Sequence, residues 1–230
     1  MNIKNKPIGI LGGMGPDASA RLYQIMIDMA RVEYVVKTNE DYPEIVLQSI
    51  PVPEFISDTN EVKKAYLMIK DRANKLINQD LCCMGITCNT AHIFIDKLRK
   101  ITKINFVSIL EEVLAEVKKR GYNRIGLLAS PATYDLELYQ KEFSGSGIEL
   151  VLPKKKDIQL LGKIVERIVI GRVNSAERKL KRIADNLKEK KVEAIVLGCT
   201  ELPIAFPKNY QLPVLDSIEI LARSLLKRYY

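Results

Sequence analysis

Short apolar runs recur along the 230-residue chain, and between them apolar residues follow a helical spacing. Runs of this kind, without alternating polar positions, are typical of strands that are buried on both faces of a parallel sheet. The predicted strands are Ile8–Leu11, Ile45–Ile50, Leu81–Thr87, Phe106–Ile109, Ile125–Ala129, Ile148–Leu152, Ala194–Leu197 and Val214–Leu215. Because these strands alternate with helical segments, the pattern predicts an α/β protein built on parallel sheets.

Several helix starts carry their own signals. Pro16 stands where the first residue of a helix is expected, since proline is tolerated at that position. Ser108 is followed three residues later by Glu111, and Asn174 by Glu177, which is the spacing of a capping box. Helices are therefore expected to begin after Ser108 and after Asn174.

The chain also contains an internal duplication. The run that holds Gly9 resembles the run that holds Gly126, and each is followed, after a similar interval, by an apolar strand that ends in cysteine and threonine, at Cys88 and Cys199. This repeat predicts two pseudo-symmetric α/β halves. We expect one half to comprise residues 1–104 and 209–230 and the other residues 105–208, with the last strand and helix crossing back to complete the first sheet.

Charge and composition exclude several classes of function. The net charge of +8 comes from basic residues that are mixed with acidic ones, which suits a small anionic substrate better than nucleic acid. A single histidine and the lack of a Cys-x-x-Cys motif argue against a metal site. Four cysteines are too few for a disulfide scaffold, and no apolar stretch approaches the roughly 20 residues of a membrane span. The glycine-rich segment near the start does not fit a signal peptide. A reduced, cytoplasmic protein is expected.

The two duplicated cysteines are the candidate chemical groups. Cys88 and Cys199 each follow a buried strand at the point where a helix is expected. Ligands of open α/β sheets bind at this edge, and a helix N-terminus there activates a thiol. If the halves face each other, the thiols flank one cleft, where one acts as base and the other as acid on opposite faces of a carbon acid. Asn89, Thr90 and Thr200 could then hold the ammonium and carboxylate groups of the ligand, whereas Cys82 and Cys83 are expected in the core.

Met84–His92 and Ile195–Pro203 resemble the two signature motifs of the aspartate/glutamate racemase superfamily, and Ile8–Pro16 resembles the opening of its aspartate racemase branch. The resemblance implies two α/β halves with the active site between them, amino acid racemisation without a cofactor, and a homodimer. It also implies that Cys88 works on the D-enantiomer and Cys199 on the L-enantiomer. The positions similar to ligand contacts of that family are Met14, Asn89, Thr90, Ser130, Thr133 and Thr200.

The substrate is less clearly indicated than the family. Aspartate racemases similar to this chain carry an arginine and a lysine for the second carboxylate, where this sequence has Phe55 and Val169. The cations that could replace them are Arg21, Lys163, Arg167 and Arg172. Aspartate or glutamate is the expected substrate, and a neutral amino acid on the same scaffold is the alternative.

Two other classes of function remain as alternatives. Gly13-x-Gly15-x-x-Ala18 matches a dinucleotide-binding fingerprint, but the acid expected after the second strand is missing. Cys88 and His92 lie four residues apart and could form the nucleophile and base of a hydrolase. Cys199 has no matching histidine, and His92 is more simply explained as a helix-surface or buried hydrogen-bonded residue.

Overall fold

The computed structural model describes residues 6–53 and 59–230. It contains two sheets, each of four parallel strands. The contacts divide the chain into two compact units, which we call unit 1 (Met1–Ile109 with Leu221–Tyr230) and unit 2 (Leu110–Ile220). Each unit holds one sheet and is an α/β layer structure, as the sequence predicts.

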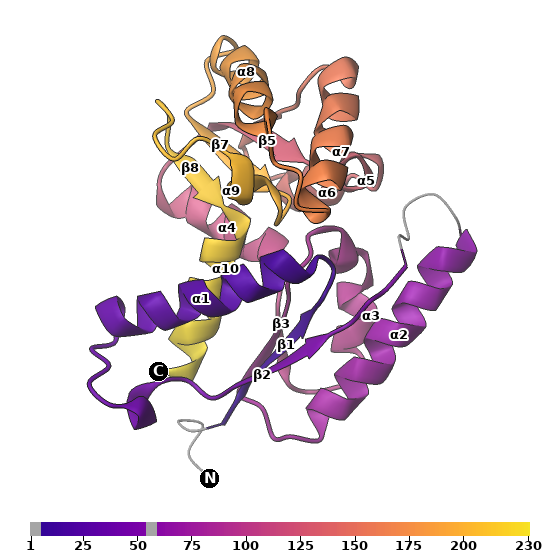
Figure 1. Cartoon of the computed structure of the whole chain (residues 1–230), viewed down its shortest axis with the longest axis vertical. Helices are drawn as coiled ribbons and strands as arrows, with labels where there is room; N and C mark the ends of the chain where they lie inside the picture. Colours follow the sequence, from indigo (N-terminus) through magenta and orange to yellow (C-terminus); the bar gives the residue numbers. More distant parts are fainter. Residues whose placement is uncertain (1–5, 54–58) are drawn as a thin grey trace. The chain divides into compact units, whose positions relative to one another are not determined.

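The sheet of unit 1 has the strand order β2-β1-β3-β4 (Figure 1). Its strands are β1 (Ile8–Gly12), β2 (Ile45–Ser49), β3 (Cys83–Ile86) and β4 (Asn105–Val107). The helical segments around this sheet are α1 (Pro16–Glu33), η1 (Asn39–Asp41), α2 (Thr59–Ile77), η2 (Thr90–Phe94), α3 (Ile95–Arg99) and α10 (Ser217–Tyr229). Pro16 is the first residue of α1, which confirms the expected helix start.

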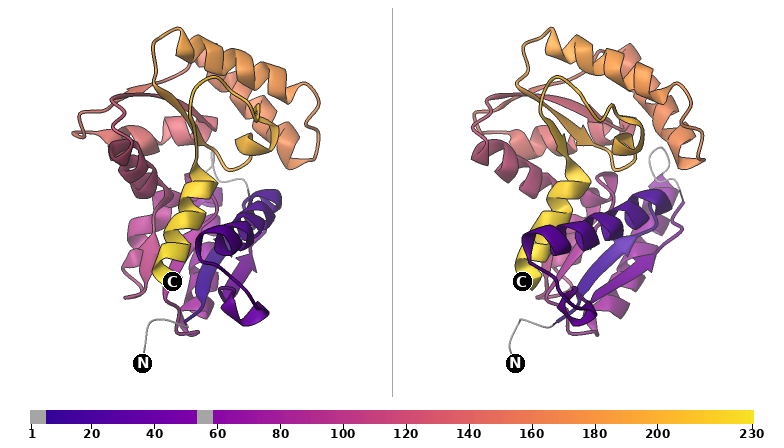
Figure 2. Two further views of the ribbon diagram at one scale, coloured as in Figure 1. Left: turned by 90° about the vertical axis from the view of Figure 1, so that its left-hand side faces the viewer. Right: turned by 60° about the vertical axis from the view of Figure 1, so that its left-hand side comes forward.

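Two glycines show which helices cover the faces of this sheet. A Cβ at Gly9 would lie 3.6 Å from Leu76 of α2, so α2 packs closely on one face. A Cβ at Gly85 would lie 3.2 Å from Leu225 of α10, so α10 packs on the other face, together with α1 (Figure 2). The absence of side chains at these positions lets helix and sheet approach each other closely.

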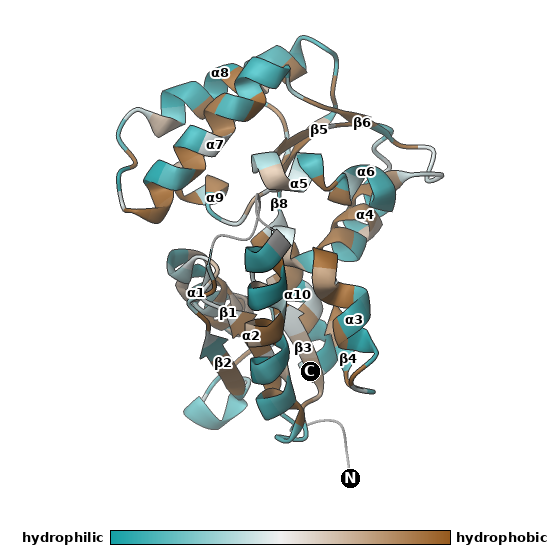
Figure 3. Ribbon diagram, turned by 90° about the vertical axis from the view of Figure 1, so that its right-hand side faces the viewer, coloured by the Kyte–Doolittle hydropathy of each residue, from teal (hydrophilic) through white to brown (hydrophobic). Residues whose placement is uncertain are grey.

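The sheet of unit 2 has the strand order β6-β5-β7-β8. Its strands are β5 (Arg124–Ala129), β6 (Glu149–Val151), β7 (Ala194–Gly198) and β8 (Val214–Asp216). Its helices are α4 (Ile109–Lys119), α5 (Pro131–Asp135), α6 (Leu138–Phe143), α7 (Lys155–Val169), α8 (Ala176–Lys188) and α9 (Leu202–Ala205). Helices α7 and α8 are amphipathic, with hydrophobic residues along one side and hydrophilic residues along the other (Figure 3).

The two sheets confirm the predicted duplication, because each has its first strand between its second and third and its fourth strand beyond the third. The helix that follows each fourth strand is exchanged between the units. Helix α4 follows β4 of unit 1 but contributes Leu110–Lys119 to unit 2, and α10 follows β8 of unit 2 but contributes Leu221–Tyr229 to unit 1.

Two local predictions are wrong. The strand expected at Val214–Leu215 pairs with β7, not with the first sheet, while Asn105–Val107, expected in the second half, pairs with β3. Only the helix crosses back, since each duplicated unit keeps its own fourth strand. Helix α8 begins at Ala176 after Ser175, so Asn174 is not its cap; the positive φ of Ser175 (63°) displaces the helix start by one residue.

No helix in the described part of the chain combines the length and the apolar character that a membrane span needs.

Candidate active site

Both candidate thiols lie at the carboxyl edge of a sheet, next to its central strands. Cys88 is two residues beyond β3, whose neighbour β1 ends at Gly12. Cys199 follows β7 directly, and the neighbouring β5 ends at Ala129, the register partner of Gly198. In open α/β sheets this edge is where ligands bind. The structure therefore places a cysteine at the carboxyl edge of the sheet in each unit.

In unit 1, the hydroxyl of Ser19 links the loop after β1 to the strand that leads to Cys88. Its Oγ accepts a hydrogen bond from the Gly13 amide (2.9 Å), donates to the Gly15 carbonyl (3.2 Å) and lies 2.9 Å from the Thr87 hydroxyl. Because Ser19 and Thr87 are buried, these bonds are shielded from water and fix the loop beside the thiol.

The glycine-rich loop is explained by packing. Gly13 has a φ of +87°, and a Cβ there would lie 2.3 Å from the backbone nitrogen of Ile50. Glycine is therefore required at this position. The Gly13 amide already donates to Ser19, whereas a dinucleotide fingerprint needs amides that point at phosphate. This geometry argues against the dinucleotide hypothesis.

The ring of His92 holds the turn around Cys88 through hydrogen bonds to two backbone groups. The amide of Ile109 donates to Nε2 of His92 (3.0 Å), so Nε2 is the accepting nitrogen. In the neutral ring the proton then lies on Nδ1, which donates to the carbonyl oxygen of Cys88 (2.8 Å). A general base for a thiol needs the ring lone pair that Ile109 occupies, which argues against the hydrolase hypothesis. His92 is 3% exposed, in line with a buried hydrogen-bonded residue.

Three of the other expected ligand contacts accompany Cys88 in unit 1. Met14 and Cys88 are both partly buried and pack against the same hydrophobic cluster. Asn89 and Thr90 directly follow the thiol and are buried. The structure thus brings the four expected residues of this unit to one end of its sheet.

The corresponding edge of unit 2 is more deeply buried. Cys199 is 6% exposed, and its Sγ donates to Oε2 of Glu201 (3.0 Å). The hydroxyl of Thr200 donates to the same carboxylate oxygen (2.9 Å). Ser130 caps α5 and lies 3.0 Å from the hydroxyl of Thr133, so both expected contacts lie at the end of β5, the strand next to β7.

Two tyrosines pack close to Cys199. Tyr134 accepts from the Ala129 amide (3.0 Å) and donates to the Leu127 carbonyl (2.8 Å), which anchors it at the end of β5. Tyr139 lies against Gly198. Burial raises the pKa of both tyrosines, and ionisation of Cys199 would raise it further, so both are neutral near pH 7. The thiol therefore lies near two aromatic rings whose hydroxyls are neutral.

The helical segments that follow the thiols are short. Cys88 precedes the five-residue 3₁₀ turn η2, which leads directly into the five-residue helix α3, and Cys199 precedes the four-residue helix α9. Segments this short align few peptide dipoles and offer little of the anion stabilisation of a longer helix. Neighbouring side chains therefore govern the chemistry of the thiols more than a macrodipole does.

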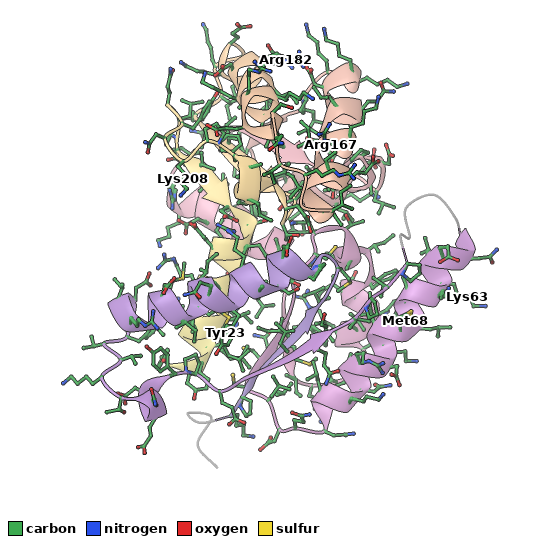
Figure 4. All side chains as sticks on the ribbon, in the orientation of Figure 1. Tyr23, Lys63, Met68, Arg167, Arg182 and Lys208 are labelled. Carbon is green, nitrogen blue, oxygen red and sulfur yellow. The ribbon has the colours of Figure 1, made fainter. Side chains whose placement is uncertain are left out.

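The cations considered for a second carboxylate differ in burial. Phe55 lies outside the described residues, and Val169 is 46% exposed. Lys163, Arg167 and Arg172 are exposed; Figure 4 labels Arg167 on α7. Arg21 on α1 is partly buried, and its Nη1 is shielded from solvent. Of these four cations, Arg21 is the one whose side chain is partly buried.

Sequence reasoning missed Glu201, Ser19 and Tyr139. Glu201 had a visible signal, because a carboxylate stands where the first motif has Thr90. Ser19 and Tyr139 lie on helices far from the two cysteine motifs in sequence, and only tertiary packing brings them to the strand ends. Among residues 6–53 and 59–230 there is no cluster of three or more side chains suited to hold a metal ion.

Comparisons with known proteins agree with this architecture. The sequence matches the family described as Asp/Glu/Hydantoin racemase over residues 11–225. It is 26% identical to the broad specificity amino-acid racemase RacX of Bacillus subtilis (strain 168), over 96% of this chain and 97% of that protein. The structure is similar to an aspartate racemase homologue from Pyrococcus horikoshii (TM-score 0.80, 28% identity, 96% of this chain and 98% of that one). It is also similar to the aspartate racemase of Picrophilus torridus (TM-score 0.85, 26% identity, 97% of this chain and 94% of that one).

Proposed function

Because the chain belongs to the Asp/Glu/hydantoin racemase family and is an amino-acid racemase, we propose that it interconverts the L and D forms of aspartate or glutamate with Cys88 and Cys199 as its two acid-base groups. The observation that carries the proposal is the duplicated placement of the thiols. Each sheet presents one cysteine at its carboxyl edge, next to a central strand.

The proposed mechanism uses one thiolate and one thiol. The thiolate removes the α-hydrogen of the bound amino acid as a proton, and the electron pair of the C–H bond stays on the substrate as a carbanion. The thiol of the other cysteine delivers a proton to the opposite face, which inverts the centre. The charges of the two sulfurs are then exchanged, and the reverse reaction starts from that state. No cofactor enters these steps.

Side chains beside the thiols would hold the substrate. Asn89 and Thr90 follow Cys88, and Thr200 follows Cys199, so amide and hydroxyl groups stand next to each reacting sulfur. Ser130 and Thr133 add hydroxyls at the neighbouring strand end of unit 2. We propose that these groups, with Met14 as an apolar contact, bind the α-amino and α-carboxylate groups.

For the side chain of the substrate, an acidic group is the leading candidate. The partial burial of Arg21 supports this choice, because a shielded guanidinium binds a carboxylate more strongly than an exposed one. A neutral substrate is the second candidate, supported by the apolar Val169 and by the broad specificity in the name of the Bacillus subtilis relative. We also propose that the protein is cytoplasmic and forms a homodimer. Light scattering on the purified protein tests the oligomeric state.

The decisive experiment is incubation with a panel of L-amino acids in heavy water, followed by chiral chromatography and mass spectrometry. We expect the D-enantiomer of aspartate or glutamate to appear with one deuterium at the α-carbon. Cys88→Ala and Cys199→Ala should each abolish racemisation, because neither thiol alone completes an inversion. Cys82→Ala is the matched control and should stay active, since Cys82 lies at the opposite end of β3 from Cys88. Full activity of Cys199→Ala would refute the two-thiol mechanism.

Reagents give a second test. Chelators and hydroxylamine should leave the activity unchanged, whereas iodoacetamide should inactivate the enzyme and substrate should slow this inactivation. A requirement for added pyridoxal phosphate would contradict the proposal.

A further inference from the structure

A buried carboxylate lies against the thiol of unit 2. Oε2 of Glu201 accepts hydrogen bonds from Sγ of Cys199 (3.0 Å) and from the hydroxyl of Thr200 (2.9 Å). All three residues are buried, with Glu201 and Cys199 each 6% exposed. In such a site water screens charge poorly, so the carboxylate and the sulfur interact strongly.

In the hydrogen bond between Cys199 and Glu201, the proton is bound to the sulfur. A carboxylic acid in water loses its proton about four pH units below a thiol, so the favoured form of this pair is a carboxylate with a neutral thiol. A thiolate at Cys199 would place a second negative charge about one hydrogen bond away from Glu201. Like charges this close disfavour ionisation of the second group.

The other groups around Cys199 act in the same direction. Asp216 of β8 adds a second acid near Tyr139, and Tyr134 and Tyr139 supply neutral rings. Helices α7 and α8 both pack against α9, and most of their basic side chains face outward: Lys163, Arg167, Arg178, Lys181 and Arg182 are exposed, and Lys179 is partly buried. The surroundings named here therefore oppose a negative charge on Cys199.

The duplicated thiol of unit 1 has no carboxylate at the matching position. In the repeat, Thr90 stands where unit 2 has Glu201, and Asn89 stands where it has Thr200. The two thiols are alike in backbone position, but the residue two positions after the cysteine is acidic in unit 2 and neutral in unit 1. This difference is the basis for assigning them different resting protonation states.

We propose that Glu201 is a positioning residue that aims the Cys199 thiol and keeps it protonated in the resting enzyme, so that Cys199 starts as the acid and Cys88 as the base. The chemical consequence rests on the proposed function, but the protonation bias itself does not. In the forward step the Cys88 thiolate takes the α-proton and the Cys199 thiol gives up its own. The product enzyme then has a thiolate beside Glu201 and returns to the resting state by proton exchange with solvent.

The test measures the pH dependence of iodoacetamide alkylation at each cysteine in the full-length protein without substrate, with mass spectrometry to assign the sites. In the wild-type protein we expect Cys199 to reach half of its maximal alkylation rate at a higher pH than Cys88. Glu201→Gln keeps an oxygen that accepts both hydrogen bonds but removes the charge. It should lower the Cys199 midpoint by at least about one pH unit, a tenfold change in ionisation, and leave the Cys88 midpoint in place.

Controls separate charge from packing. Glu201→Asp retains the charge and should keep a midpoint closer to that of the wild-type protein, and Glu166→Gln, at an exposed position on α7, should change neither midpoint. The proposal is overturned if Glu201→Gln leaves the Cys199 midpoint unchanged or raises it. It is also overturned, whether or not that variant folds, if Cys199 of the wild-type protein ionises at a lower pH than Cys88.

Racemisation is measured separately on the same variants. Because the two enantiomers are equally stable, kcat/KM has the same pH profile in both directions. Under the proposal, Glu201→Gln shifts the alkaline limb of this profile, which follows ionisation of the Cys199 thiol, to lower pH, and Glu166→Gln leaves it in place. Failure to racemise any amino acid, with the alkylation shift intact, contradicts the proposed function but not the role of Glu201.

Discussion

Replacing His92 by alanine tests whether its ring is a structural clamp on the turn around Cys88. The ring connects the Cys88 carbonyl, which precedes η2, to the amide of Ile109, the first residue of α4. Alanine has no polar side-chain atom, so both backbone groups lose these partners in a region that water does not easily enter. We expect a large loss of stability from this single change.

The magnitude follows from the two bonds. An unsatisfied buried backbone group costs about 1–3 kcal/mol, so two such groups cost about 2–6 kcal/mol, before the loss of ring packing is added. Total stabilities of native proteins are about 5–15 kcal/mol. For a chain of this size a loss of about 3 kcal/mol lowers Tm by about 6–12 °C.

Urea denaturation followed by circular dichroism measures the loss, with the slope of the transition checked for two-state behaviour. His92→Gln is the matched variant, because its amide offers one donor and one acceptor, as the neutral ring does. It should recover part of the lost stability. If His92→Ala is as stable as the wild-type protein, or if His92→Gln is no more stable than His92→Ala, the clamp is not what holds this turn.

Three further changes have specific expected outcomes. Gly198→Ala would place a Cβ 2.7 Å from the buried ring of Tyr139, and we expect a loss of about 1–3 kcal/mol in urea denaturation; an unchanged midpoint would contradict the close packing at this position. Burial raises the pKa of Tyr230 to about 12, and its hydroxyl donates to the Asp41 carbonyl (2.6 Å). Tyr230 therefore ionises at a lower pH in the unfolded chain than in the folded protein. Its contribution to the free energy of unfolding should be fully present below about pH 10 and be lost as the pH rises toward 12, and Tyr230→Phe should weaken this decline. Arg21→Met should raise KM for an acidic substrate at least about tenfold, or about 1.4 kcal/mol, while Arg21→Lys should raise it less; an unchanged KM would favour a neutral substrate or another cation.

The strands could be predicted from the sequence because a strand that is buried on both faces is a continuous run of apolar residues. Ile125–Ala129 and Ala194–Leu197 were each predicted within a residue of the observed strands β5 and β7. The duplicated cysteine motifs were visible for the same reason, since each follows such a strand directly. Both thiols could thus be assigned to strand ends before the fold was known.

The order of the strands within a sheet and the contacts between side chains could not be predicted in this way. Val214–Leu215 has the apolar character of a buried strand in either sheet, so its pairing with β7 depends on tertiary packing alone. The hydrogen bond from Cys199 to Glu201 depends on the rotamers of two nearby residues, and the one between Ser19 and Thr87 depends on how α1 packs on the sheet. Glu201 is visible in the second cysteine motif, but its contact with the sulfur of Cys199 cannot be read from the sequence.

The exchanged helices set an order for folding during synthesis. Unit 2 is a continuous stretch, so all of its residues have been made before the ribosome reaches Leu221. Unit 1 begins before unit 2 but requires Leu221 and Leu225 of α10, which cover Gly85 of its central strand and are synthesised after all of unit 2. Unit 1 is therefore completed after unit 2, and until then one apolar face of its sheet stays available to chaperones or to incorrect partners.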